Sequence, residues 1–341
     1  MPLSLLLAAA LSTTAAPAAD TKATGTSLPA RFESDLVYVA PTFVDGNSLL
    51  FYTDTGGGYF IDSDVVTQQG IATVPGSEDL RRELGPNAML ARLPAQQEDR
   101  SIPLGIADDG TIPVLANAKR GKLPGMRPVD GMLGAPWFAG RIWTWDFKAA
   151  QFRVERADWA AGSTARRVPL GFKRAPDGSA GLAYPRIDVR IDGKVLPLLF
   201  DTGAMTVLAP AALAVLNDAA PAQRATSMIV DTVFQAWRKA HPEWRVIEAA
   251  QLGTGSAMIE VPEVEIAGWR VGPVWFTHRA NRNFHDFMSR MTDTRIEGAI
   301  GNNVFREFRM TLDYPNAAAH FVCTGRCVDI AETGITPQPA P

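Results

Sequence analysis

The chain has 341 residues, which at about 150 residues per domain suggests two domains or one large one. Apolar residues make up 46% and charged residues 20%, with a mean hydropathy of −0.01, so a wholly disordered chain is excluded. The 33 basic and 36 acidic residues leave a net charge of −3, and this gives no basic excess to neutralise a nucleic-acid backbone. The 29 glycines and 25 prolines favour a turn-rich, β-dominated chain.

Residues 1–19 have the pattern of a signal peptide. Residues 3–11 form an apolar run that is too short for a membrane helix, and Ala16 and Ala18 suit a cleavage site. Only the amino terminus supplies positive charge there, so an unstructured Ala-rich tail is the alternative. No other stretch reaches the ~18 uninterrupted apolar residues of a membrane span. We therefore expect an exported protein, periplasmic or extracellular, with no membrane span.

Two cysteines, Cys323 and Cys327, lie near the C-terminus. In an oxidising compartment this spacing predicts a local disulfide, which would hold the C-terminal segment rather than the whole fold. Free thiols are one alternative. A zinc site that includes His320 is the other, although a structural zinc site needs four ligands.

The sequence contains an internal repeat, seen first in a turn followed by an Asp-Thr-Gly motif. Residues 45–46 (Asp-Gly) and 54–56 (Asp-Thr-Gly) recur 147 positions later at 192–193 and 201–203. A second pair of motifs, GMLG and GAIG with their flanks, is offset by 167 positions at Gly131 and Gly298, Gly134 and Gly301, and Asp146 and Asp313. Matches at several separated points indicate two homologous lobes.

The difference between the two offsets places about twenty extra residues in the second copy. Apolar residues recur there at helical spacing in TSMIVDTVFQAWRKAH, which predicts an inserted helix near 226–240. This helix would either roof the cleft or pack on the outside of the second lobe.

We expect lobes at 30–155 and 165–328, joined by a polar stretch near 157–182, and a disordered Pro-rich tail at 329–341. The Asp-Gly pairs predict tight turns, and SLLFYT and VLPLLF predict short buried strands. Each buried strand then ends in an Asp-Thr-Gly.

A carboxylate placed directly after a buried strand is costly unless something pairs with it. Two such aspartates, one per lobe, can meet at a two-fold axis and share a single proton. One carboxylate then takes a proton from a water while the other carboxyl hydrogen-bonds a scissile carbonyl. This is amide hydrolysis without a metal or a covalent intermediate.

The segments YTDTGGGYFID, LLFDTGAMTVLAP, GMLG and GAIG resemble the aspartic proteases, in particular their retropepsin-like (retroviral-protease-like) branch. The resemblance implies an all-β fold of two pseudo-symmetric, closed-barrel-like lobes, with both copies fused so that a monomer is complete. It also implies peptide or protein substrates, no cofactor and no metal.

Carried over by position, the resemblance assigns roles to the repeated residues. Asp54 and Asp201 would be the catalytic pair. Thr55 and Thr202 would join the two loops by hydrogen bonds, and Gly56 and Gly203 would permit the tight turns. The segments 132–134 and 299–301, which end in Gly134 and Gly301, would brace the loops.

The sequence departs from the family at Gly57, where Ser or Ala is usual and where the second copy has Ala204. This departure raises a doubt about pH optimum. Flaps over the substrate are expected at 252–266 in the second lobe and within 80–115 in the first, with Asp109-Gly110 at a turn.

Two other functions are considered. A catalytically inactive module of this fold would bind peptides or a protein partner without cutting. A metal hydrolase would use His278 and His285, but no His-Glu-x-x-His occurs and these histidines are expected at the surface or between the lobes. Trp143 and Trp145 alternate along an expected strand, so both should face one side in the core.

Overall fold

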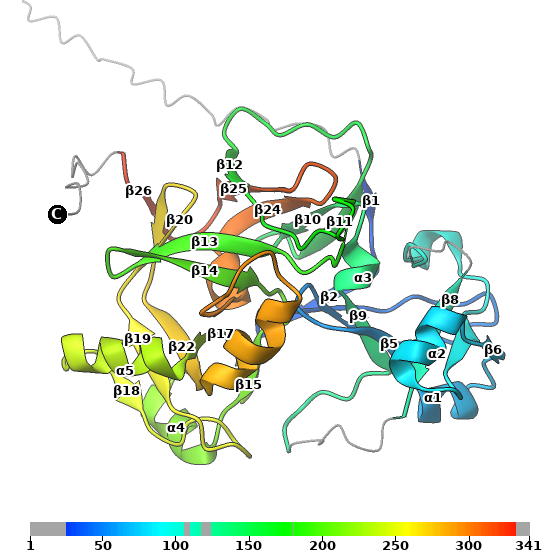
Figure 1. The fold of residues 1–341 in the computed structure, drawn as a ribbon, viewed down its shortest axis with the longest axis horizontal. Coiled ribbons are helices and arrows are strands. Elements are labelled where there is room, and N and C mark those ends of the chain that lie inside the picture. Colours follow the sequence, from blue (N-terminus) through cyan, green and yellow to red (C-terminus); the bar gives the residue numbers. More distant parts are fainter. Residues whose placement is uncertain (1–24, 106–109, 117–123, 180, 332–341) are drawn as a thin grey trace, which may run out of the picture.

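The computed structural model describes residues 25–105, 110–116, 124–179 and 181–331. The chain forms two β-rich lobes side by side, with a third sheet across the top of the molecule in Figure 1. The predicted signal peptide at 1–19, and residues 332–341 of the predicted tail, lie outside the described residues. No helix within the described ranges is long and apolar enough to cross a bilayer.

Lobe one is built on an eight-stranded sheet. In spatial order its strands are β2 (Ala30–Glu33), β3 (Leu36–Val39), β4 (Phe51–Asp54), β9 (Gly131–Gly134), β5 (Tyr59–Asp62), β8 (Thr111–Leu115), β7 (Met89–Arg92) and β6 (Thr73–Pro75). Its helices are α1 (Ser63–Gln68), α2 (Glu78–Leu84), η1 (Glu98–Arg100) and α3 (Ala135–Phe138). The central strands β4 and β9 are parallel and pair Asp54 with Gly134.

Lobe two is built on a ten-stranded sheet. In spatial order its strands are β18 (Val246–Ile247), β19 (Met258–Val261), β22 (Val274–Arg279), β17 (Ser227–Val230), β23 (Gly298–Ile300), β14 (Lys194–Phe200), β13 (Arg186–Ile191), β20 (Val264–Ile266), β21 (Trp269–Val271) and β26 (Cys327–Asp329). A small sheet pairs β15 (Met205–Val207) with β16 (Gln223–Ala225). The helices are α4 (Pro210–Leu216), α5 (Asp231–Ala240), the π-helical η2 (Arg282–Phe287), η3 (Met288–Arg290) and α6 (Asn302–Phe305).

The hairpin that delivers the second Asp-Thr-Gly follows directly from its sequence. Asp192 and Gly193 both have positive φ, 51° and 71°, as a two-residue turn that matches strand twist requires. On β13, alternate apolar residues are buried and the intervening ones face out, which fixes the register against β14.

A third sheet joins the two lobes. In spatial order it contains β1 (Thr26–Ser27), β11 (Gln151–Glu155), β10 (Ile142–Asp146), β24 (Phe308–Asp313), β25 (Ala318–Cys323) and β12 (Arg166–Pro169). At its centre β10 of the first copy pairs antiparallel with β24 of the second, and the hydroxyls of Thr144 and Thr311 lie 2.8 Å apart. These threonines are 167 positions apart, which is the repeat offset. Equivalent residues therefore meet on an approximate two-fold axis.

The expected closed barrels are not formed by the described residues. The sheet of lobe one is open between β2 and β6, and that of lobe two is open between β18 and β26. Closure requires the first and last strands of a sheet to pair. The strands after each second motif pair across the axis in the third sheet instead.

The inserted helix of lobe two is present as α5, but it begins at Asp231 because Ser227–Val230 forms β17. Phe234 and Trp237 are buried against the sheet, where the Trp237 ring lies 5.4 Å from that of Phe276. In Figure 1, α5 lies on the side of lobe two away from lobe one. Of the two positions considered, the helix takes the outer one.

Neither expected flap has the predicted form. In lobe two, β19 and β20 are consecutive along the chain but are separated by several strands in the sheet, so 252–266 is not a hairpin. In lobe one, β8 pairs with β7 rather than with the segment 101–105, and Asp109 lies outside the described residues. Long-range pairing with β22 and β13 draws β19 and β20 apart.

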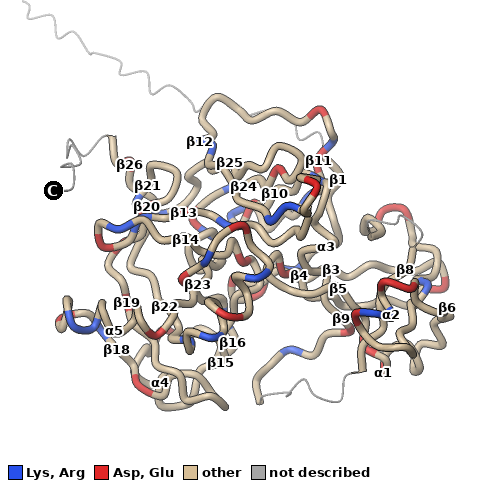
Figure 2. The backbone as a smooth tube through the Cα atoms, viewed as in Figure 1, with Lys and Arg blue, Asp and Glu red and all other residues tan. Residues whose placement is uncertain are grey.

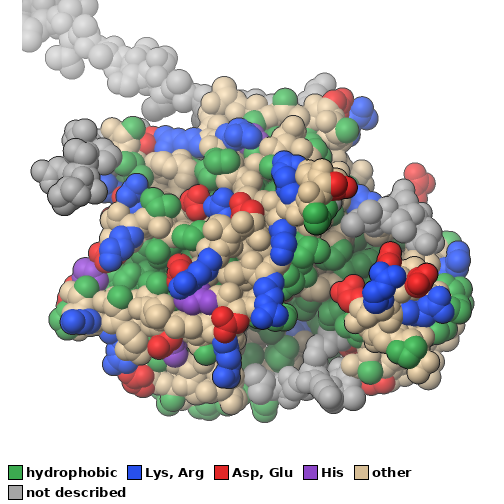
Figure 3. Space-filling model, viewed as in Figure 1, with side chains coloured by type: hydrophobic (Ala, Val, Ile, Leu, Met, Phe, Trp, Pro, Cys, Tyr) green, Lys and Arg blue, Asp and Glu red, His purple; other side chains and the backbone are tan. Residues whose placement is uncertain are grey.

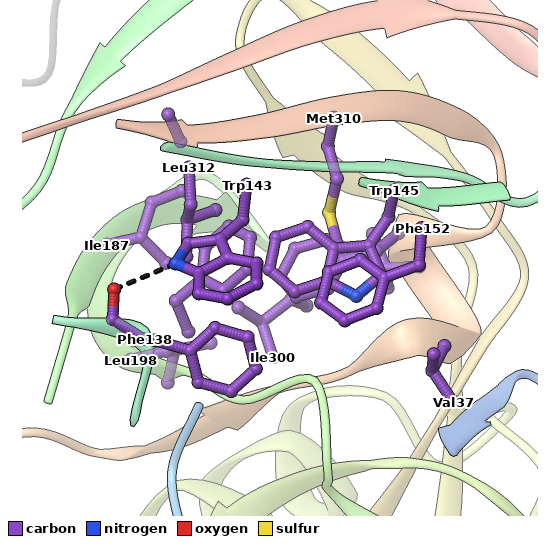
Figure 4. Packing of buried hydrophobic residues seen from close by; sticks show 14 of the residues in the cluster. Val37, Phe138, Trp143, Trp145, Phe152, Ile187, Leu198, Ile300, Met310 and Leu312 are labelled. Carbon is purple, nitrogen blue, oxygen red and sulfur yellow. Dashed lines mark hydrogen bonds between the residues drawn. The ribbon is translucent and has the colours of Figure 1, made fainter. Parts of the chain in front are cut away.

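Aromatic side chains fill the core beneath the third sheet. Trp143 and Trp145 are fully buried on the same side of β10, as predicted, and both contact the ring of Phe152 at 5.5 and 4.7 Å between centroids (Figure 4). Trp143 Nε1 donates to the carbonyl of Phe138 at 2.8 Å. Trp145 Nε1 has no partner among the described residues.

Cys323 and Cys327 form a disulfide, as expected from their spacing. The disulfide joins the end of β25, in the third sheet, to the start of β26, at the edge of lobe two. Charged residues of both signs are interspersed over the molecule (Figure 2), in keeping with the near-balanced composition.

The two tryptophans provide a matched test of core energetics. We expect Trp143→Phe to lower the free energy of unfolding by about 1–3 kcal/mol more than Trp145→Phe, because only the first change leaves a buried carbonyl without its donor. Urea unfolding followed by circular dichroism measures both values. Equal losses would contradict this account of the hydrogen bond.

Candidate active site

The two Asp-Thr-Gly loops leave the sheets at equivalent places. Asp54 ends β4, beside the parallel β9, and Asp201 directly follows β14, beside the parallel β23. In each lobe the motif strand therefore lies next to the strand that carries the second motif, so the repeat in sequence becomes a repeat in space.

Reciprocal hydrogen bonds join the two loops. The amide N–H of Thr55 donates to Thr202 Oγ1 at 3.1 Å, and the N–H of Thr202 donates to Thr55 Oγ1 at 3.0 Å. Thr55 Oγ1 also donates to the carbonyl of Phe200 at 2.6 Å. Both threonines are fully buried, so these bonds are shielded from water.

The motif glycines are required by close approach. A Cβ on Gly56 would lie 2.8 Å from Cγ of Asp201, and one on Gly203 would lie 2.1 Å from Cγ of Asp54. Each glycine N–H also donates to the aspartate of its own loop, Gly56 to Asp54 Oδ1 at 2.8 Å and Gly203 to Asp201 Oδ1 at 3.0 Å. Any side chain at either position would push the two aspartates apart.

Asp54 and Asp201 are hydrogen-bonded to each other through their carboxyl groups. Burial raises the pKa of both, and the neighbouring charge of Asp54 raises the pKa of Asp201 further, well above the usual range of an aspartic acid. At Asp54, hydrogen bonds from Asp201 and from the loop backbone oppose the effect of burial on its pKa. The two carboxyl groups therefore titrate as a pair, which holds one shared proton between its first and its second ionisation.

The segments with the second motifs support the loops from below. The N–H of Ala135, next to Gly134, donates to the carbonyl of Gly57 at 3.0 Å, and the N–H of Asp201 donates to the carbonyl of Ile300 at 3.0 Å. A Cβ on Gly134 would lie 2.1 Å from the carbonyl oxygen of Gly57, and one on Gly301 would lie 2.1 Å from that of Thr226. The structure thus brings all the sequence-predicted loop and brace residues together.

Two buried side chains at the loops were not identified from the sequence. Tyr52 Oη donates to the carbonyl of Gly203 at 2.8 Å, and it crosses from lobe one to lobe two. Asn302 Nδ2 donates to the carbonyls of Thr202 at 2.7 Å and Asp35 at 2.8 Å. The signal that could have found Asn302 is its place directly after the brace Gly301.

The structure explains the departure at Gly57. A Cβ there would lie 2.5 Å from Met132 Sδ and 2.6 Å from Asp54 Oδ2. Met132 already occupies the space beside this position, so Ala or Ser would have to displace either Met132 or the carboxylate.

A cavity of about 510 Å³ opens beside the aspartate pair. Gly56 and Asp201 lie at one side of it, and η2 and η3 provide a wall (orange in Figure 1). Its lining residues are Gly56, Leu199, Asp201, Met228, Arg279, Arg282, Asn283, Phe284, Phe287 and Met288. Figure 3 shows apolar side chains along the hollow between the two lobes. The segment that the sequence placed at the surface or between lobes therefore borders the candidate site.

The histidines considered as metal ligands each contact a carboxylate instead. His278 Nε2 lies 2.9 Å from Asp231 Oδ1, and His285 Nε2 lies 2.8 Å from Glu297 Oε2. Across the described ranges, no group of three or more His, Cys, Asp or Glu side chains is arranged to hold a metal ion.

No protein-family model and no curated protein matches the chain. Among solved structures, the aspartic proteinase from Irpex lacteus is 11% identical over 88% of this chain and 97% of its own, with a TM-score of 0.46. Basic 7S globulin from soybean is 9% identical over 93% and 98%, with a TM-score of 0.43. A retropepsin-like aspartic protease from Rickettsia conorii is 12% identical over 46% and 90%, with a TM-score of 0.27. At this distance the similarities indicate neither an activity nor a substrate.

The geometry itself defines the fold type. Two β lobes, related by an approximate two-fold axis, present Asp-Thr-Gly loops that are hydrogen-bonded to each other across that axis. This is a two-lobed, mostly β fold of the aspartic-protease kind, with open sheets rather than closed barrels.

The threonine bonds predict an asymmetric response to mutation. Thr55→Val should lower the free energy of unfolding by about 2–4 kcal/mol, because the N–H of Thr202 and the carbonyl of Phe200 both lose a buried partner. Thr202→Val should cost about half as much, since only the N–H of Thr55 loses its acceptor. Urea denaturation of both variants beside Thr55→Ser, which keeps the hydroxyl, measures the difference; a larger loss in Thr202→Val would refute it.

The raised pKa values predict how stability depends on pH. Because the folded pair binds protons more tightly than the unfolded chain, its contribution to stability is present below the unfolded pKa, near 3.9, and is lost as the pH rises through the folded pKa. Wild type should therefore lose stability relative to Asp201→Asn as the pH rises above about 4. Urea unfolding at several pH values measures this difference, and a difference that grows in favour of wild type would exclude a pair with raised pKa.

Proposed function

We propose that this protein is an endopeptidase that hydrolyses peptide bonds with Asp54 and Asp201. The supporting observation is the pair of carboxyl groups, held in hydrogen-bond contact by backbone and threonine contacts from both lobes, at the side of a cavity that can receive a peptide. The fold accommodates many chemistries in principle, so the proposal rests on this site.

In the proposed reaction the charged Asp54 accepts a proton from a water held between the carboxyl groups. The water oxygen forms a bond to the scissile carbonyl carbon, and protonated Asp201 donates a hydrogen bond to the carbonyl oxygen as negative charge develops on it. Collapse of the tetrahedral intermediate breaks the C–N bond, and a proton passes to the leaving nitrogen. The products are a carboxylic acid and an amine, and the pair ends with one shared proton.

The raised pKa values set the expected pH range of this reaction. The pair is active when it holds one proton, so activity falls at low pH when Asp54 is protonated and at high pH when Asp201 loses its proton. Burial raises the pKa of both carboxyl groups above that of an ordinary aspartic acid, and the charge of Asp54 raises the pKa of Asp201 further. We therefore propose a mildly acidic to neutral optimum.

We further propose assignment to the retropepsin-like branch, on the basis of the GMLG and GAIG segments that follow each loop, and action as a monomer, because one chain carries both aspartates. Export is proposed from the pattern at 1–19, and the Cys323–Cys327 disulfide is compatible with an oxidising compartment.

A mass-spectrometric cleavage assay tests the proposed activity. A diverse peptide pool is incubated at pH 3 to 7 with wild type, Asp54→Asn and Asp201→Asn, with Asp45→Asn as a control from an exposed turn. We expect cuts with wild type and the control, and a loss of about 10³-fold or more in both active-site variants, because each removes a proton-transfer group.

Three outcomes would contradict the proposal. Cuts that survive both active-site substitutions would place the chemistry elsewhere. Unchanged cutting in only one of them would exclude a cooperating pair. No cuts at any pH from folded protein would favour a module that binds peptides or a protein partner without cleaving them.

A further inference from the structure

Two arginines line the cavity, and Arg279 is the more buried of them, since Arg282 is exposed to solvent. Arg279 is the last residue of β22 and lines the cavity together with Asp201. Leu199, Met228 and Phe284 are among the apolar residues around it. A guanidinium in such surroundings calls for a partner, because burying an unpaired charge is costly.

The protein supplies Arg279 with only neutral partners. Nη1 donates to Gln251 Oε1 at 2.7 Å and to the carbonyl of His278 at 3.1 Å. Within the described part of the chain, no carboxylate lies within ion-pair distance of Arg279, and this includes Asp201 in the same cavity. By contrast, Arg186 and Arg306 each pair with an aspartate, at 2.7 and 2.8 Å.

Several donors of Arg279 thus remain free. A guanidinium has five N–H groups in a planar fork, and both of the hydrogen bonds that Arg279 makes to Gln251 and His278 come from Nη1. Nε and Nη2 make no hydrogen bond to the described residues and are not among the buried nitrogens that lack a partner, so they are accessible to solvent in a residue that lines the cavity. The hydrogen bonds to Gln251 and His278 hold Nη1 in place and leave Nε and Nη2 available to a ligand.

Arg279 also remains charged wherever the aspartate pair can work. Burial lowers its pKa to about 10, and the nearby Asp201 opposes this change. This pKa is still far above the mildly acidic range of the proposed reaction, so the side chain is a permanent cation there.

We propose that Arg279 selects an acidic side chain of the substrate, at the residue that occupies the lobe-two side of the cavity beside the scissile bond. The fork geometry matches a carboxylate, which accepts two parallel hydrogen bonds. Glutamate suits the site better than aspartate, because its longer aliphatic stem can pack against Met228 and Phe284 before the carboxylate reaches the guanidinium. This inference rests on the proposed function for its substrate class.

Peptide pools that differ at one position test the preference. Octapeptides with apolar residues elsewhere carry Glu, Gln or Lys at a central position and are cleaved at pH 6 by wild type, Arg279→Gln and Arg279→Glu. Wild type should cut the Glu pool about 10-fold or more faster than the Gln pool, as expected for a charged hydrogen bond. Arg279→Gln should lose the preference, and Arg279→Glu should favour Lys. The matched control is Arg245→Gln, whose arginine pairs with Glu260 on the surface and does not line the cavity.

A binding experiment separates failure of this inference from failure of the proposed activity. Fluorescence anisotropy measures the affinity of the labelled Glu and Gln pools for Asp54→Asn protein, with and without Arg279→Gln. Cutting without a Glu preference overturns the inference and leaves the activity standing. If no peptide is cut, but the protein binds the Glu pool more tightly and Arg279→Gln abolishes this preference, the proposed activity is overturned and the inference is supported. Equal binding of both pools to Asp54→Asn protein overturns the inference whatever the cleavage result.

Discussion

Two carboxyl groups in hydrogen-bond contact repel each other unless they share a proton, and the chain must hold them in place against that repulsion. The buried threonine bonds between the two loops provide this restraint, and they require that both lobes present their loops at the same height and in opposite directions. The third sheet supplies that alignment, since β10 and β24 pair antiparallel across the same axis with Thr144 opposite Thr311. The remaining packing of both lobes supports this one arrangement.

The two-fold symmetry relates the backbone contacts of the two loops, but the side chains around the loops do not follow it. Gly57 and Ala204 occupy equivalent positions, and at the first of them Met132 Sδ fills the space that a Cβ would need. Tyr52 of lobe one reaches the loop of lobe two at Gly203, whereas Asn302 of lobe two reaches lobe one at Asp35, outside the loop that carries Asp54. The geometry of the two loops is therefore symmetric at the aspartates, while the side chains around them differ from lobe to lobe.

Much of the fold was predictable because the repeat offsets are themselves contacts. The offset of 147 reappears as the Thr55–Thr202 hydrogen bonds, and the offset of 167 reappears as the Thr144–Thr311 pair. Sequence spacing carries this information since equivalent residues of a duplicated chain meet on its symmetry axis. The disulfide was predictable for a different, local reason, since cysteines four residues apart can reach each other without help from the rest of the fold.

The features that could not be predicted depend on pairing between distant segments. The hairpin expected at 252–266 does not form, because β19 pairs with β22 and β20 pairs with β13 at distant positions in the same sheet. No local sequence pattern predicts these pairings. The lobe sheets stay open because their end strands, β2 and β6 in lobe one and β18 and β26 in lobe two, do not pair with each other. Arg279 is one arginine among many in the sequence, and only the fold places it in the cavity beside Asp201.

The wall formed by η2 and η3 has a consequence for the direction of a bound chain. A perfectly two-fold site would accept a polypeptide in either of two equivalent orientations, N to C or C to N, with the same energy. Of the described residues that line the cavity, only Gly56 comes from lobe one. With both copies in one chain, the two halves of the site differ, so under the proposed function a peptide laid across the axis would meet different neighbours at its two ends and would have a single preferred polarity.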